Sequence, residues 1–247
     1  MNNITLLSHP FRDERQSRLF LLIVLATCFD VFLAQARFVL KQARAYPSGD
    51  FTWPEIQSFF GLSWSFLIWN LFLAWIPYLA ALLFERLQAA GAGRWALFGW
   101  FGIWLAFLPN APYIVTDFIH LEPRPPIPVW YDMVLLFSFA CTGMALGVFS
   151  LYEVHRALRR QFSGPIAHLI IFGAGGLAGF GVWLGRFLRW NSWDILANPA
   201  GLLQDILQTL SSRYELIKAL GISGLMGAVL LMGYLMFYAV LAMEKRT

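Results

Sequence analysis

Charged residues are scarce in this 247-residue sequence, in which Asp, Glu, Lys and Arg together make up 13%. Soluble domains carry about a quarter of such residues, so the composition argues against an ordinary water-soluble protein. Cysteine is scarce too, and Cys28 and Cys141 each lie inside an apolar run. We interpret them as small buried side chains rather than as a disulfide or a metal-binding pair. The sequence also has no internal repeat and no low-complexity tract.

Long apolar runs are abundant instead. Hydrophobic residues make up 59% of the sequence, and the mean hydropathy is +0.61. Six runs are close to the length of about 20 residues that crosses the hydrocarbon core of a bilayer. They cover residues 19–36, 61–84, 95–116, 130–153, 165–188 and 219–242. Because the runs are too long for barrel strands and lack their strict alternation, they predict helices, whose backbone groups are satisfied internally in lipid.

The predicted fold class is therefore all-α: a polytopic transmembrane helical bundle of about six helices. Residues 19–242 are expected to form one transmembrane domain between an N-terminal tail, residues 1–18, and a C-terminal tail, residues 243–247. After Asn198-Pro199, apolar and polar residues separate onto two faces up to Leu210, which predicts a short amphipathic helix at the outer membrane interface before the last span.

The first run has an alternative interpretation as a signal peptide. Arg12, Arg15 and Arg18 precede it, and the small residues 34–36 resemble a cleavage site. The length of the run and the presence of Asp30 near its end favour an uncleaved helix. Cleavage would leave five helices in the same orientation.

The distribution of Lys and Arg predicts the orientation. Ten of the eighteen lie in the two tails and in the 85–94 and 154–164 segments, a small excess that favours placing both termini in the cytoplasm. The pI near 9.3 does not indicate nucleic-acid binding, because the basic residues are spread over helix ends. Such residues serve membrane topology and contact with anionic lipids, so the expected partner is the lipid bilayer.

The third run ends in "FLPNAPYIVTDFIH", residues 107–120. Pro109 and Pro112 lack backbone donors and clash with the preceding turn, so they free carbonyl groups that lipid cannot satisfy. We expect the helix to be interrupted between Phe107 and Pro112, near its outer end. Asn110 is expected to cap a new helix that begins at Ala111.

Polar residues beyond this break predict a site at one membrane depth. Tyr113, Asp117 and His120 fall on one helical face, although a plain helix end reaching water would also explain Asp117 and His120. Ionisable residues follow at the start of the fourth run and in "GRFLRWNSWD", residues 185–194. The candidate ligand-binding residues are Asn110, Tyr113, Asp117, His120, Asp132, Arg186, Arg189, Asn191 and Asp194.

The cost of an unpaired charge in a membrane predicts how these residues are arranged. We expect at least one carboxylate among Asp117, Asp132 and Asp194 to lie within hydrogen-bonding reach of Arg186 or Arg189. His120 is expected to border the same cavity.

Two further features predict helix packing. Asn70, in the middle of the second run, is typical of polar contacts between membrane helices. Gly175 and Gly179, like Gly181 and Gly185, are four residues apart, and small residues at that spacing let helices approach closely.

The stretches "WNLFLAWIP", "FLPNAPYIVTDFIHL", "WYD" and "GRFLRWNSWD" resemble a family of bacterial integral membrane proteins, domain-of-unknown-function family 1361. The resemblance spans residues 69 to 194. It implies a multi-helix protein of a bacterial cytoplasmic (inner) membrane, in which these polar stretches are family hallmarks. It supplies no activity, cofactor or substrate.

Three classes of function remain open. The first is binding or transport of a small anionic molecule or lipid head group, received by Arg186 and Arg189. The second is a membrane enzyme in which Asp117 and His120 form an acid/base pair or bind a metal, although the sequence matches neither HExxH nor a serine elbow. The third is a scaffold whose charges pair with each other. The sequence assigns no cofactor and no oligomeric state.

Overall fold

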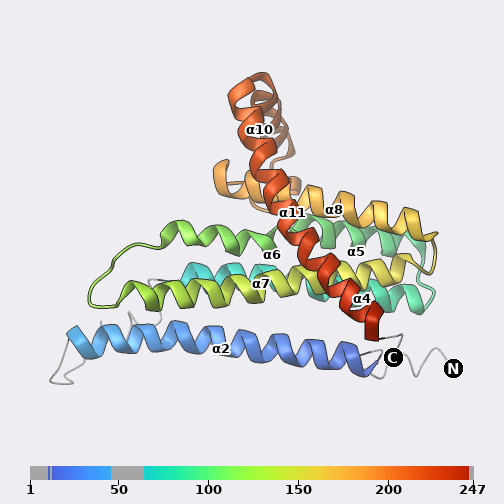
Figure 1. Cartoon of the computed structure of the whole chain (residues 1–247). Coiled ribbons are helices and arrows are strands. Elements are labelled where there is room, and N and C mark those ends of the chain that lie inside the picture. Colours follow the sequence, from blue (N-terminus) through green and yellow to red (C-terminus); the bar gives the residue numbers. More distant parts are fainter. Residues whose placement is uncertain (1–10, 12, 46–63, 245–247) are drawn as a thin grey trace.

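The computed structural model describes residue 11 and residues 13–45 and 64–244, and this part of the chain consists of helices joined by short connections, without strands (Figure 1). The helices are α2 (Glu14–Ala45), α4 (Ser65–Ala89), α5 (Arg94–Phe107), α6 (Asn110–Tyr113), the 3-10 helix η1 (Ile114–His120), α7 (Val129–Leu158), α8 (Gly164–Phe187), α9 (Asp194–Ala197), α10 (Pro199–Ser211) and α11 (Arg213–Glu244).

Six spans in the described residues are long and apolar enough to cross a membrane. They are Glu14–Lys41, Ser65–Ala89, Arg94–His120, Val129–Leu158, Gly164–Phe187 and Arg213–Glu244. This confirms the predicted all-α polytopic bundle. Residues 61–63, the predicted start of the second helix, lie outside the described part of the chain.

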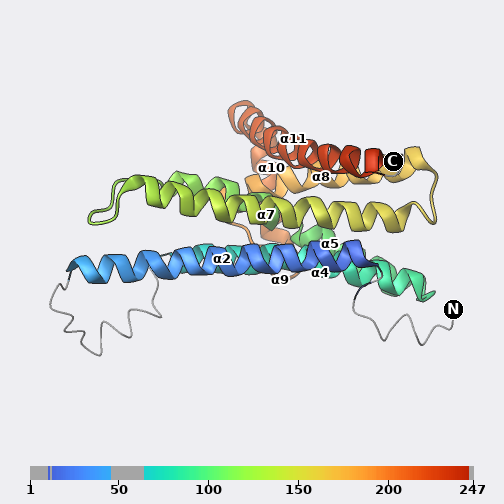
Figure 2. The ribbon, with the colours of Figure 1, turned by 60° about the horizontal axis from the view of Figure 1, so that its bottom comes forward.

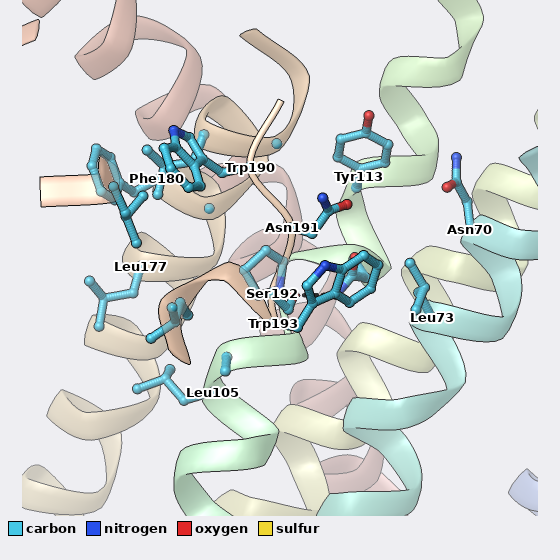
Figure 3. Close-up of a pocket in the computed structure, with 18 of the residues that line it drawn as sticks. Asn70, Leu73, Leu105, Tyr113, Leu177, Phe180, Trp190, Asn191, Ser192 and Trp193 are labelled. Atoms are coloured by element: carbon cyan, nitrogen blue, oxygen red, sulfur yellow. Dashed lines mark hydrogen bonds between the residues drawn. The ribbon is translucent and has the colours of Figure 1, made fainter. Parts of the chain in front are cut away.

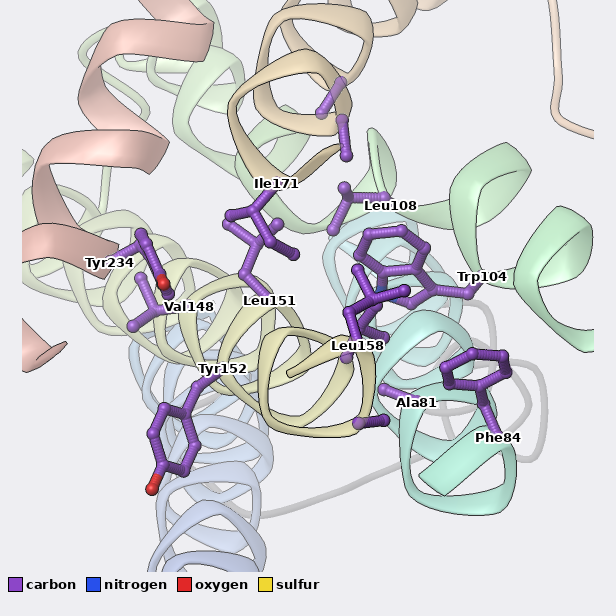
Figure 4. Packing of buried hydrophobic residues seen from close by; sticks show 14 of the residues in the cluster. Ala81, Phe84, Trp104, Leu108, Val148, Leu151, Tyr152, Leu158, Ile171 and Tyr234 are labelled. Atoms are coloured by element: carbon purple, nitrogen blue, oxygen red, sulfur yellow. The ribbon is translucent and has the colours of Figure 1, made fainter. Parts of the chain in front are cut away.

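The helix α7 is the centre of the bundle. In Figure 2, α2 and α4 lie on one side of it, and α8 and α11 on the other. Buried side chains from these helices and from α5 meet around it in two apolar clusters, the first of which includes Trp104, Leu151, Ile171 and Tyr234 (Figure 4). Because α7 is apolar on most of its circumference, it is buried on several sides.

Polar contacts at three depths dock α2 onto α7 in antiparallel orientation. The pairs are Gln16 with Glu153, Asp30 with Ser138, and Arg37 with Asp132. The predicted end of the first helix at residue 36 was wrong, since α2 continues to Ala45. The physical reason is that the guanidinium of Arg37 is buried against a carboxylate and so does not need to leave the bundle.

The third span is interrupted as predicted. The interruption changes the backbone hydrogen bonds more than it changes the direction of the chain. The helix α5 ends at Phe107 and α6 begins at Asn110, yet Pro109 keeps helical angles of φ −56° and ψ −28°. The backbone N–H of Ala111 donates to the carbonyl of Leu108 at 3.2 Å, a 3-10 bond that uses a carbonyl freed by Pro112.

The predicted capping role of Asn110 was wrong. Its side chain makes no capping bond to α6, and its Nδ2 instead donates to the carbonyl oxygen of Phe107 at 2.9 Å. The asparagine thus satisfies a carbonyl at the end of α5 rather than an N–H at the start of α6.

The glycines of α8 permit the close helix packing that their spacing predicts. A methyl group on Gly179 would overlap the backbone carbonyl of Ser223 in α11, and one on Gly175 would lie 2.6 Å from Leu231. The predicted amphipathic helix is α10, which Asn198 caps by accepting from the N–H of Gly201 at 3.1 Å. Figure 1 shows α10 projecting from the body of the bundle.

Candidate functional site

A buried ion pair lies behind the candidate site. Arg186, in the last turn of α8, donates from Nη2 to Oδ1 of Asp117 in η1. The Asp117 side chain is 1% exposed and that of Arg186 is 15% exposed. This contact confirms the predicted pairing of one of the three aspartates with one of the two arginines.

Neighbouring groups hold the Arg186–Asp117 pair in place. Asn70 of α4 donates from Nδ2 to Oδ2 of Asp117 at 2.8 Å. Thr116 accepts from Nε of Arg186 at 2.7 Å, and the ring of Tyr113 stacks 4.4 Å from the guanidinium carbon. Asn70 therefore joins α4 to η1, the helix–helix role that its place in the second run predicts.

A cavity of about 470 Å³ lies in front of this pair, between α4, α5, α6, α8 and the segment that enters α9 (Figure 3). Its polar lining side chains are Asn70, Asn110, Tyr113, Asn191 and Ser192. Its other lining residues are Trp69, Leu73, Gly102, Leu105, Ala106, Pro109, Leu177, Phe180, Gly181, Leu184, Gly185, Trp190, Trp193, Ile195 and Leu202. Within the described chain, no Asp, Glu, Lys, Arg or His lines this cavity.

Three of the predicted ligand-binding residues line the cavity: Asn110, Tyr113 and Asn191. The Nδ2 of Asn110 also donates to Oγ of Ser192 at 3.0 Å, which ties the broken helix to the segment after α8. The break at Pro109 and Pro112 thus places an amide side chain on the cavity wall.

Two of the predicted residues have partners away from the cavity. Asp132 binds Arg37 through two hydrogen bonds of 2.5 and 2.9 Å, and does not reach Arg186. His120 packs its ring against Phe66, with the ring centroids 4.9 Å apart. The prediction that His120 borders the cavity was therefore wrong: neither His120 nor Phe66 is among the residues that line it.

The last two predicted residues shape the chain after α8. Arg189 is exposed and adopts φ 60°, the left-handed conformation that ends a helix. Asp194 accepts from the backbone N–H of Asn191 at 2.7 Å and from its Nδ2 at 3.1 Å. Both residues are occupied with local turn geometry, so neither contacts Asp117.

A second charged cluster lies at the other end of α7. The buried carboxylates of Glu85 and Glu153 are paired with Arg160 and Arg156, the latter at 2.7 Å from Glu153. Asp13 joins this cluster through an ion pair with Arg156 at 2.7 Å. Arg156 and Arg160 belong to the basic segments from which the cytoplasmic side is predicted. Nowhere in the described residues do three or more His, Cys, Asp or Glu side chains gather in a way that could hold a metal ion.

The sequence reasoning missed the aromatic lining of the cavity. Tryptophan at a helix end is typical of a membrane interface, yet Trp190 and Trp193 line the cavity, together with Trp69 and Phe180. The Nε1 of Trp190 donates to Asp205 of α10 at 2.8 Å, which fixes that ring. The only signal in the sequence was the density of tryptophan next to asparagine and serine in "RWNSWD".

Comparison with known proteins gave one family and no individual relative. Searches of curated proteins and of solved structures found no match. The family model described as "Protein of unknown function (DUF1361)" matches residues 69–237, which contain the whole cavity and the Arg186–Asp117 pair. By the extent of that match, the chain belongs to the DUF1361 family of proteins of unknown function.

Proposed function

We propose that this protein binds an uncharged amphipathic molecule, such as a membrane lipid with a hydroxyl- or amide-rich head group, in the cavity between α4, α5 and α8. The observation that carries the proposal is the chemistry of the wall: aromatic and aliphatic side chains with neutral amide and hydroxyl groups, and no charged side chain among the described residues that line it. Ligand pockets are mostly apolar with a few placed polar groups.

The two kinds of lining side chain suit the two parts of such a ligand. Asn110, Asn191 and Ser192 offer neutral donors and acceptors to a polar head group. Leu105 and Leu177 offer apolar surface to a hydrocarbon chain. The volume of about 470 Å³ falls within the range of small-molecule pockets, about 300–1,000 Å³, and suits a head group with part of a chain.

Access from the bilayer is supported by the exposure of the cavity edge. Trp69 is 54% exposed and Leu177 is 55% exposed, and both line the cavity from within membrane spans. Exposed residues of a membrane span face lipid, so a lipid can reach the cavity sideways. This route needs no aqueous path.

The ion pair favours an uncharged ligand over the anion that the arginines predict. Arg186 already donates to Asp117 and Thr116, and Tyr113 covers its guanidinium face. An anionic ligand would compete with a carboxylate that is already in place. The enzyme alternative has less support, because Asp117 is held by Asn70 and Arg186, and neither Asp117 nor His120 lines the cavity.

Two glycines of α5 allow a matched test. Gly102 and Gly99 both have open space where a side chain would begin. Gly102 lines the cavity, and Gly99 does not. We expect uncharged lipid to raise the melting temperature of the wild type and of Gly99→Leu in detergent, by the stabilisation of about 2.7 kcal/mol that a ligand gives at 100 times its Kd. Gly102→Leu, whose side chain fills the cavity, should lose this shift. Equal shifts in all three proteins would contradict the proposal.

The cellular location belongs to the same proposal. The six apolar spans support a multi-pass membrane protein. A bacterial inner membrane stays a prediction from the family resemblance. The orientation, with both termini in the cytoplasm and the cavity toward the outer face, stays a prediction from the basic residues.

A further inference from the structure

Asp30 is a buried carboxyl group at the interface of α2 and α7, away from the cavity. It lies well inside the span Glu14–Lys41, and the residue is 0% exposed. Ser138 of α7 donates a hydrogen bond to its Oδ1. Ionisable residues inside a membrane are costly and are functional candidates by default.

Asp30 differs from the other buried aspartates in its partners. Asp117 and Asp132 each have an arginine, whereas no ion pair among the described residues involves Asp30. Arg37 is seven residues further along α2, roughly 10 Å at the helical rise, and it is already bound to Asp132 by two hydrogen bonds.

The hydroxyl groups around Asp30 leave room for a hydrogen on its second oxygen. Oδ2 of Asp30 is buried without a hydrogen-bond partner in the described structure. The hydroxyl of Thr142 lies close to the carboxyl, but its hydrogen is donated to the carbonyl of Ser138 at 3.2 Å. A hydroxyl both donates and accepts, so Thr142 can also accept a hydrogen bond from a protonated Asp30.

We infer that Asp30 is a proton-binding site in the membrane: α2 docks on α7 with this carboxyl protonated, and loss of the proton leaves a buried carboxylate without a cation. The titratable neighbour on α7 is Cys141. On α4, Trp75 donates to Thr27, which lies three residues before Asp30 on α2, and this tryptophan does not titrate. The Arg37–Asp132 pair is the charged contact of the same interface.

Carbodiimide labelling tests this inference on the wild-type protein. Dicyclohexylcarbodiimide partitions into bilayers and reacts with a protonated carboxyl group to give a stable N-acylurea, which peptide mass spectrometry locates. We expect Asp30 to be labelled in vesicles at neutral pH, with the labelled fraction falling about tenfold per pH unit once the proton is lost. Asp132 and Asp117, which are paired with arginines, should stay unlabelled under the same conditions.

Two controls accompany the labelling. The Asp30→Asn variant shows whether the label is on Asp30 or on another carboxyl group, and added sodium ions distinguish a bound proton from a bound metal cation. Asp30→Asn, a neutral side chain of the same shape, should abolish the adduct without lowering the melting temperature. Absence of label on wild-type Asp30, or equal labelling of Asp30 and Asp132, would overturn the inference. Protection by sodium ions at constant pH would also overturn it, since the site would then bind a metal cation in place of a proton.

Discussion

Replacing Arg186 by glutamine removes the cation that contacts Asp117 and leaves a buried carboxylate with Asn70 as its remaining donor. Breaking a buried ion pair from one side costs about 3–5 kcal/mol, because the survivor is an uncompensated charge. Since Asp117 is 1% exposed, we expect Arg186→Gln to lower the free energy of unfolding by an amount near the upper end of that range.

Removing the other partner, Asp117, should lower the free energy of unfolding by less. Asp117→Asn leaves Arg186 with Thr116 and Tyr113, and its side chain is 15% exposed, so water can reach part of the guanidinium. The double variant carries two neutral side chains and should be more stable than Arg186→Gln alone. We expect a coupling energy of about 1–3 kcal/mol between the two sites.

The assay is equilibrium unfolding in mixed micelles titrated with sodium dodecyl sulfate, applied to the wild type, the two single variants and the double variant. Arg189→Gln is the matched control. Because Arg189 is exposed, this substitution should change the free energy of unfolding by no more than about 0.5 kcal/mol. Losses that add within about 0.5 kcal/mol would show that Arg186 and Asp117 are energetically independent, and the two residues would then not form a coupled pair.

Two further predictions use the same titration. Gly179→Ala should lower the free energy of unfolding by about 1–3 kcal/mol or more, because its methyl group would overlap the carbonyl of Ser223. Gly176→Ala meets open space and should be neutral or stabilising. Equal effects of the two substitutions would contradict the close packing of α8 on α11. Arg189→Gly should raise the free energy of unfolding by about 1 kcal/mol, because φ 60° is strained for arginine and free for glycine. A loss of stability there would show that the Arg189 side chain makes a contact of its own.

The parts of the fold that were predictable follow from the bilayer as a solvent. A run such as 130–153 must be helical and long enough to cross, and α7 contains that whole run. The break after Phe107 was predictable for the same reason, since two prolines remove backbone donors whatever surrounds them.

The partners of the polar residues were less predictable, because sequence gives the depth of a residue and not the direction in which it faces. Asp132 was one of three aspartates considered as partners of Arg186 or Arg189, but its side of α7 faces α2, where Arg37 is its partner. Arg37 was also missed as a partner because it lies just beyond the end of the first apolar run, at residue 36. An arginine that forms a buried pair ends an apolar run without ending the helix, and α2 continues to Ala45.

The cavity depended on packing between segments far apart in sequence. Trp69 of α4 and Trp193 before α9 belong to one wall only because α4, α5 and α8 leave a space that they share. Tryptophan at a helix end is typical of a membrane interface, and composition alone does not distinguish the two roles.

Native mass spectrometry of the protein purified in mild detergent shows whether the cavity holds an uncharged lipid. We expect the wild type and Gly99→Leu to retain an uncharged lipid, and Gly102→Leu, which fills the cavity from the same helix, to be recovered without it. Retention of that lipid by Gly102→Leu, or an anionic lipid bound in its place to the wild type, would show that the cavity is not an uncharged-lipid site.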